Sequence, residues 1–109
     1  MSAGGPLTLG DVLATPTHPG RDVLLFLAPV PVLTLDTLAL VVDLDEGEEE
    51  LEAVESRTGF RYALGLRNVR QVVTNARLQR QRATSADLLR AFLYYLDHDA
   101  FIDFRTAPE

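Results

Sequence analysis

Two aspartates, Asp43 and Asp45, stand where an apolar run gives way to glutamates, within the stretch ALVVDLDEGEEELEAVES at residues 39–56. An aspartate at the end of a buried strand can attack a phosphoryl group, and paired carboxylates can hold a divalent cation. Eight acids fall between residues 43 and 55, and no basic residue accompanies them. The segment therefore raises three hypotheses: a catalytic Asp-x-Asp site, a metal loop, or an acidic surface that meets a partner.

The catalytic and metal hypotheses lack the companion residues that they require. The aspartate pair resembles the first motif of haloacid-dehalogenase-type phosphatases, but Gly47 stands where that motif has threonine or valine, and the chain has no lysine to balance a phosphate. As an EF-hand loop that begins at Asp43, the segment has Val54 at the twelfth position instead of glutamate. We therefore expect no catalytic residue, no metal and no cofactor here, and we keep a small metal-dependent hydrolase as an alternative.

A second polar cluster, Asp97-His98-Asp99, and the isolated His18 offer further metal ligands. Consecutive residues of a helix point about 100° apart, so these three side chains do not converge on one ion. We interpret the cluster as a polar helix end, and the hydrolase alternative uses His98 with Asp43 and Asp45. The chain contains no cysteine, which excludes disulfides, thiol catalysis and thiolate metal sites.

Basic residues are as one-sided as the acids. Seven of the ten arginines fall between residues 57 and 82, where no acid occurs. Such a segment could follow the phosphates of a nucleic acid. The net charge of −6 opposes the approach of a polyanion, and no nucleic-acid-binding motif is present. We therefore expect no nucleic-acid partner, and we place the arginines on an exposed helix flank where some of them pair with the acidic segment.

Hydrophobic periodicity and capping residues predict elements in the order α-β-β-α-β-α-α. We expect helices at about 9–15, 47–58, 66–81 and from 84 onward, strands at about 22–28, 37–44 and 60–66, and a short strand or packed tail at 99–104. This order predicts one α+β domain over residues 1–109, a two-layer sandwich in which helices cover a sheet of about three strands. We expect residues 1–6 to fray and residues 105–109 to form a tail.

The N-terminal residues have neither the basic region nor the apolar core of a signal peptide, and no apolar run approaches the length of a membrane span. These features predict a cytoplasmic protein that does not cross a membrane.

Three stretches together resemble a known family: ALVVDLDE, YALGLRNVRQVVTNARLQ and LLRAFLYYLDHDAFIDF. It is an uncharacterised bacterial family of small acidic single-domain proteins, similar to the immunity proteins that accompany polymorphic toxins. The resemblance covers about residues 37–104. It implies a non-catalytic protein-binding role with Asp43, Asp45, Tyr94, Tyr95 and Asp99 to Asp103 as the family-like positions.

The candidate binding surface combines the acidic segment with the end of the last helix. Acidic side chains steer a basic partner, such as a basic toxin domain, and raise the rate of association more than the final affinity. Tyr94 falls opposite the apolar stripe of its helix, where it is either exposed or an interface anchor. The candidate partner-binding residues are Asp43, Asp45, Glu46, Glu48, Glu49, Glu50, Tyr94 and Asp99.

A third alternative is a self-associating structural or regulatory subunit. In it the acidic helix of one copy pairs with the arginine helix of another, so the expected state is a monomer or a homodimer.

Overall fold

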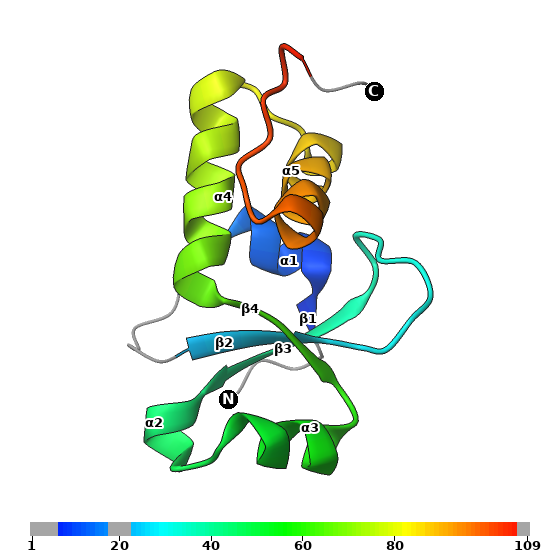
Figure 1. Ribbon diagram of the computed structural model, residues 1–109, viewed down its shortest axis with the longest axis vertical. Helices are drawn as coiled ribbons and strands as arrows, with labels where there is room; N and C mark the ends of the chain where they lie inside the picture. The colour runs from blue at the N-terminus through cyan, green and yellow to red at the C-terminus, as the bar shows by residue number, and fades with distance from the viewer. Residues whose placement is uncertain (1–6, 18–22, 107–109) are drawn as a thin grey trace.

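The computed structural model describes residues 7–17 and 23–106. A small sheet crosses the middle of the molecule, with helices on both sides (Figure 1). The chain order is β1-α1-β2-β3-α2-α3-β4-α4-α5. The elements are β1 (Leu7–Thr8), α1 (Leu9–Ala14), β2 (Val23–Leu27), β3 (Leu38–Asp43), α2 (Leu44–Gly47), α3 (Leu51–Thr58), β4 (Arg61–Gly65), α4 (Leu66–Gln79) and α5 (Ser85–His98).

The capping signals of the sequence set the helix boundaries. The Thr8 hydroxyl accepts a hydrogen bond from the Asp11 N–H at 3.2 Å, and the Asp11 carboxylate accepts one from the Thr8 N–H at 3.0 Å. Thr84 and Asp87 form the same reciprocal pair at the start of α5. Gly59 has a φ of 79°, the left-handed conformation that glycine adopts without strain, and it ends α3. Both capping boxes and the glycine stop are confirmed.

The sheet is antiparallel with strand order β1-β3-β2-β4. The α+β class is confirmed, and the sheet has four strands where about three were expected. The additional strand, β1, contributes only two residues, which pair with Leu38 and Ala39 of β3. Two residues are too few to produce a hydrophobic alternation, so the sequence carried no periodic signal for this strand.

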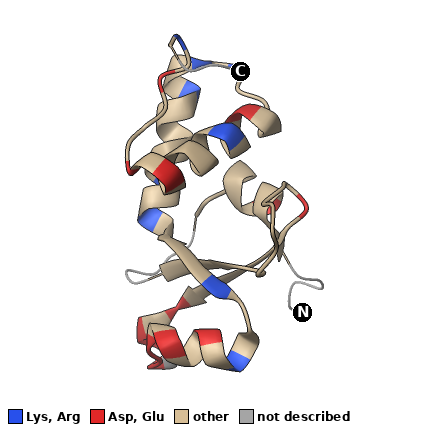
Figure 2. Ribbon diagram, turned by 45° about the vertical axis from the view of Figure 1, so that its right-hand side comes forward, with Lys and Arg blue, Asp and Glu red and all other residues tan. Residues whose placement is uncertain are grey.

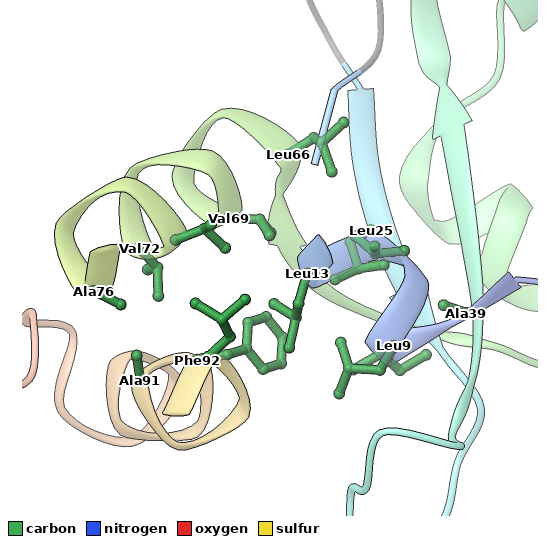
Figure 3. Packing of buried hydrophobic residues seen from close by; sticks show 14 of the residues in the cluster. Leu9, Leu13, Leu25, Ala39, Leu66, Val69, Val72, Ala76, Ala91 and Phe92 are labelled. Carbon is green, nitrogen blue, oxygen red and sulfur yellow. The ribbon is translucent and has the colours of Figure 1, made fainter. Parts of the chain in front are cut away.

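The main core lies between one face of the sheet and helices α1, α4 and α5 (Figures 1 and 3). Phe92 of α5 is fully buried, and its ring reaches toward Leu13 of α1 (Figure 3). Val69, Val72, Val73 and Ala76 are the buried face of α4. This packing is the helix-on-sheet arrangement that the apolar stripes of the two long helices predict.

A smaller apolar interior lies on the opposite face of the sheet, which α2 and α3 cover (Figure 1). Leu25 and Leu27 belong to the main core, so the intervening Phe26 points to this second face. Phe26 of β2 and Val54 of α3 are both 0% exposed, and neither belongs to the main cluster. The Phe26 ring meets the Tyr62 ring edge-on, with centroids 6.1 Å apart. These side chains fix α3 against the sheet.

The C-terminal segment is a packed tail, one of the two outcomes expected for residues 99–104. Ile102 and Phe104 are buried, and the side chain of Gln79 binds the backbone between them. Gln79 Nε2 donates to the Ile102 carbonyl at 2.6 Å, and Gln79 Oε1 accepts from the Phe104 N–H at 3.0 Å. The side chain of Gln79 thus makes the hydrogen bonds to these backbone groups that a neighbouring strand would make if the segment were part of a sheet.

Gln79→Glu tests this attachment of the tail. The carboxylate can still accept from Phe104, but it cannot donate to the Ile102 carbonyl and places negative charge against that oxygen. We expect the free energy of unfolding to fall by about 2 kcal/mol, because a part-buried acceptor loses its partner. Chemical denaturation measures the change. Gln71→Glu, an exposed position on the same helix, is the matched control, and equal costs for both variants would contradict the attachment.

Asp87 joins the start of α5 to the end of α4. Its carboxylate accepts from the Thr84 N–H and from Arg80 Nη1, both at 3.0 Å. The Thr84 N–H and the charge of Arg80 hold the pKa of Asp87 below its ordinary value. The Arg80 guanidinium also lies 4.5 Å from the Phe104 ring centroid, so one arginine contacts both helices and the tail.

The lowered pKa of Asp87 predicts how the stability depends on pH. A carboxyl whose pKa is lower in the folded state stabilises the protein above its unfolded value, about 3.9, and this contribution disappears as the pH falls through the folded pKa. We therefore expect Asp87→Asn to be less stable than the wild type at neutral pH, and the difference to shrink at acidic pH. Thermal unfolding of both proteins, measured from neutral pH down to about 3, gives the difference in stability at each pH. A difference that stays constant with pH would contradict the assignment.

Candidate functional site

The acidic segment does not form the single helix expected over residues 47–58. It forms the short helix α2, then a break at Glu48, whose φ of 52° is left-handed, and then α3. The Asp43 carboxylate accepts a hydrogen bond from the Glu46 N–H at 3.2 Å, and this cap starts α2 directly after β3. The expectation of one helix was wrong because Asp43 acts as a cap and the chain turns immediately after Gly47.

We call residues 43–55, with α2 and most of α3, the acidic lobe. Figure 2 shows its acidic residues gathered at one end of the molecule. Five of its side chains are exposed and form no ion pair with another described residue. They are Asp45, Glu46, Glu48, Glu50 and Glu52. The break at Glu48 spreads these carboxylates over two short helices and the turn between them.

One acid of the lobe, Glu49, forms an ion pair with an arginine of the same chain, Arg57. Arg57 Nε and Nη2 donate to the two Glu49 oxygens at 3.0 and 2.8 Å, a bidentate pair. The hydrogen bond to Glu49 and the charge of that carboxylate raise the pKa of Arg57. Glu55 accepts from the Tyr62 N–H at 2.9 Å and so binds α3 to strand β4. Among the ion pairs of the described residues, only the one between Arg57 and Glu49 involves an acid of the lobe.

The other two candidate binding residues lie away from the acidic lobe. Tyr94 lies near the end of α5 and Asp99 directly follows that helix, which packs on the opposite face of the sheet from α2 and α3 (Figure 1). The Tyr94 ring is half-buried against the main core and stacks on His98, with centroids 3.9 Å apart. Asp99 has a φ of 55° and ends α5. The structure therefore brings together six of the eight candidates and separates these two.

The residues of the hydrolase alternative do not converge. Asp43 caps α2, Asp45 is exposed on that helix, and His98 lies at the end of α5 across the sheet (Figure 1). Within residues 7–17 and 23–106, no group of three His, Asp or Glu side chains is placed to hold a metal ion. His18 lies outside the described residues.

One protein-family match covers all the helices and strands described above. Residues 6–104 match the model of a domain of unknown function, DUF7716. The chain belongs to this family. The acidic lobe, α4 and α5 all lie inside the DUF7716 domain. No curated protein and no solved structure matches the chain. Of the helices in the described part of the DUF7716 domain, none is long and apolar enough to cross a membrane.

The DUF7716 domain also has a cleft that the sequence did not predict. It has a volume of about 560 Å³ and lies where the tail crosses α4, between Gln79, Arg80 and the segment 101–105. Its polar groups are already engaged: Gln79 binds the tail backbone, and Arg80 pairs with Asp87. The cleft depends on the path of the tail, and no local sequence pattern specifies that path.

Proposed function

We propose that this DUF7716 protein is a non-catalytic binding module that recognises a basic protein partner through its acidic lobe. One observation carries the proposal: five exposed carboxylates lie at one end of the molecule without an ion pair to any described residue. Like charges held close together repel one another, so an acidic cluster of this kind lowers the stability of the isolated protein. A basic surface relieves this repulsion when it binds.

The way in which the lobe is held favours recognition over a flexible acidic tail. Phe26 and Val54 are buried beneath it, and Glu55 and Glu49 each make hydrogen bonds that fix α3. A surface that is already ordered loses little conformational entropy on binding. Its unpaired charges steer the encounter, and salt in solution weakens this steering.

The resemblance to polymorphic-toxin immunity proteins suggests the biological setting. In this proposal the protein acts in the bacterial cytoplasm, where it binds a basic toxin domain stoichiometrically and neutralises or regulates it. The exposed carboxylates of the lobe suit this role, because they raise the association rate and an inhibitor benefits from rapid association.

Capture from a lysate of the native host tests the proposal. The immobilised wild-type chain is compared with Glu46→Gln/Glu52→Gln, which neutralises two exposed acids of the lobe. Asp36→Asn/Asp97→Asn changes the net charge equally, at two exposed positions outside the lobe and outside the candidate binding residues, and is the matched control. We expect a basic protein, identified by mass spectrometry, on the wild type and the control only. Equal retention on all three chains would contradict the proposal.

A further inference from the structure

The outward face of α4 is a second charged surface that the proposed function does not use. Arg67, Arg70 and Arg77 are exposed on this helix, and none of them forms an ion pair with another described residue. Leu78 on the same helix is 78% exposed, and Phe101 of the tail is 45% exposed. A shallow groove of about 410 Å³ runs between them, past Arg70 and Thr74. We call these residues the arginine face.

The arginine face and the acidic lobe occupy opposite halves of an elongated molecule. Its extents are 42 × 29 × 25 Å, and α4 lies in one half of the long axis while α2 and α3 lie in the other (Figure 1). Helices α4 and α2 also lie along the same long side in the views of Figures 1 and 2. Arg77 Nη2 donates to the Ala14 carbonyl at 3.3 Å, but none of the three arginines forms an ion pair with another described residue.

We propose that the arginine face binds the acidic lobe of a second copy, in an antiparallel dimer with twofold symmetry. The inference rests on the proposed function, since it names a further partner for the same acidic lobe. A twofold axis that lies in the contact plane, perpendicular to the long axis of the molecule, places an inverted second copy beside the first. Each lobe then meets the other copy's arginine face, so the same contact forms twice and the assembly closes.

Charge complementarity favours a second copy over a nucleic acid as the occupant of this face. A polyanion that approaches the arginine face also meets the repulsion of a chain with a net charge of −6. A second copy has the same net charge, but it also carries its own arginine face, so an inverted copy places opposite charges against each other at both contacts (Figure 2). Exposed Leu78 and Phe101 add apolar area that the contact can bury, which a phosphate backbone would not use.

We expect the dimer to be weak and to dissociate when salt is added. Exposed ion pairs contribute little individually, so the dimer requires several pairs acting together. We expect the wild type to sediment as a dimer at about 100 µM protein in about 50 mM salt, and to dissociate as the salt rises to about 500 mM. A monomer under both conditions would overturn the inference, as would a dimer that is insensitive to salt.

Two charge-reversed variants identify the surfaces. Arg67→Glu/Arg70→Glu makes the arginine face acidic. Asp45→Arg/Glu46→Arg/Glu50→Arg/Glu52→Arg leaves Glu48 as the one acid among the five exposed positions of the lobe and makes that surface basic, and all the substituted positions are exposed. In a homodimer of either variant, like charges meet at both contacts, so each variant alone is expected to be monomeric. In a mixture of the two, opposite charges meet at both contacts, and the dimer is expected to return. A mixture that stays monomeric, or single variants that still dimerise, would overturn the inference.

The same variants separate a failure of this inference from a failure of the proposed function. Arg67→Glu/Arg70→Glu retains the acidic lobe and should still capture the basic partner from lysate. If the wild type is monomeric but captures that partner, only the dimer is wrong. If the wild type dimerises through these surfaces but captures no basic protein, the lobe serves self-association, and the proposed function is wrong.

Discussion

Phe26→Ala is expected to lower the free energy of unfolding by about 3–5 kcal/mol, the range for deleting a buried aromatic ring. Phe26 is 0% exposed and lies outside the main core, on the face of the sheet that α3 covers (Figure 1), so removal of the ring leaves a cavity there. Because small domains are stable by only about 5–15 kcal/mol, this loss brings the protein close to unfolding. Urea denaturation measures it.

The same substitution should loosen α3 before the rest of the fold. The main core does not contain Phe26, so α4 and α5 keep their packing. Hydrogen exchange is therefore expected to accelerate most at the amides of Leu51–Thr58. Leu78→Ala, at a side chain 78% exposed, is the control and should change the stability by less than about 0.5 kcal/mol. Uniform acceleration across α3, α4 and α5 would contradict a separate interior beneath the acidic lobe.

Neutralising the lobe is expected to slow the association with the basic partner by about tenfold or more at low salt. The variant is Glu46→Gln/Glu52→Gln, and the binding partner is the protein that the wild type captures. The dissociation rate should change less, because exposed charges guide the encounter more than they hold the complex. Stopped-flow measurements at about 50 and about 500 mM salt should show the difference between the variant and the wild type disappear at the higher salt.

The matched control for this measurement is Asp36→Asn/Asp97→Asn, which removes the same number of acids outside the lobe. If net charge alone governs association, the two variants will slow to the same extent. The account predicts that the control stays close to the wild type, since Asp36 and Asp97 lie outside the acidic lobe. Equal slowing would show that the position of the lobe has no importance.

Local signals in the sequence predicted most of the fold. The capping boxes at Thr8 and Thr84 and the glycine stop at Gly59 act within a few residues, so the sequence specifies them directly. Strand β1 was missed because two residues show no period, and the strand forms only through pairing with β3. The sheet order and the Gln79 contact to the tail depend on residues far apart in the chain, which no local pattern encodes.

The candidate site was predicted in part for the same reason. The acids of residues 43–50 are neighbours in sequence and remain neighbours in the structure. Tyr94 was placed by helical periodicity on the side opposite the apolar stripe, but its ring packs against the core and on His98. The Arg57 pair with Glu49 required the break at Glu48, because that turn places Glu49 within reach of the end of α3. The position of Asp43 directly after a strand, where it can cap a helix, was the available signal for this break. The continuous run of acidic residues after it instead indicates a single helix start.

Amide chemical shifts of the labelled protein, titrated with the captured basic partner, test the central claim most directly. The account predicts that the largest perturbations fall on residues 44–52, the segment that carries the exposed carboxylates of the acidic lobe. It also predicts that these perturbations weaken as salt is added. Perturbations that concentrate instead on the cleft between α4 and the tail, with residues 44–52 unchanged, would contradict it.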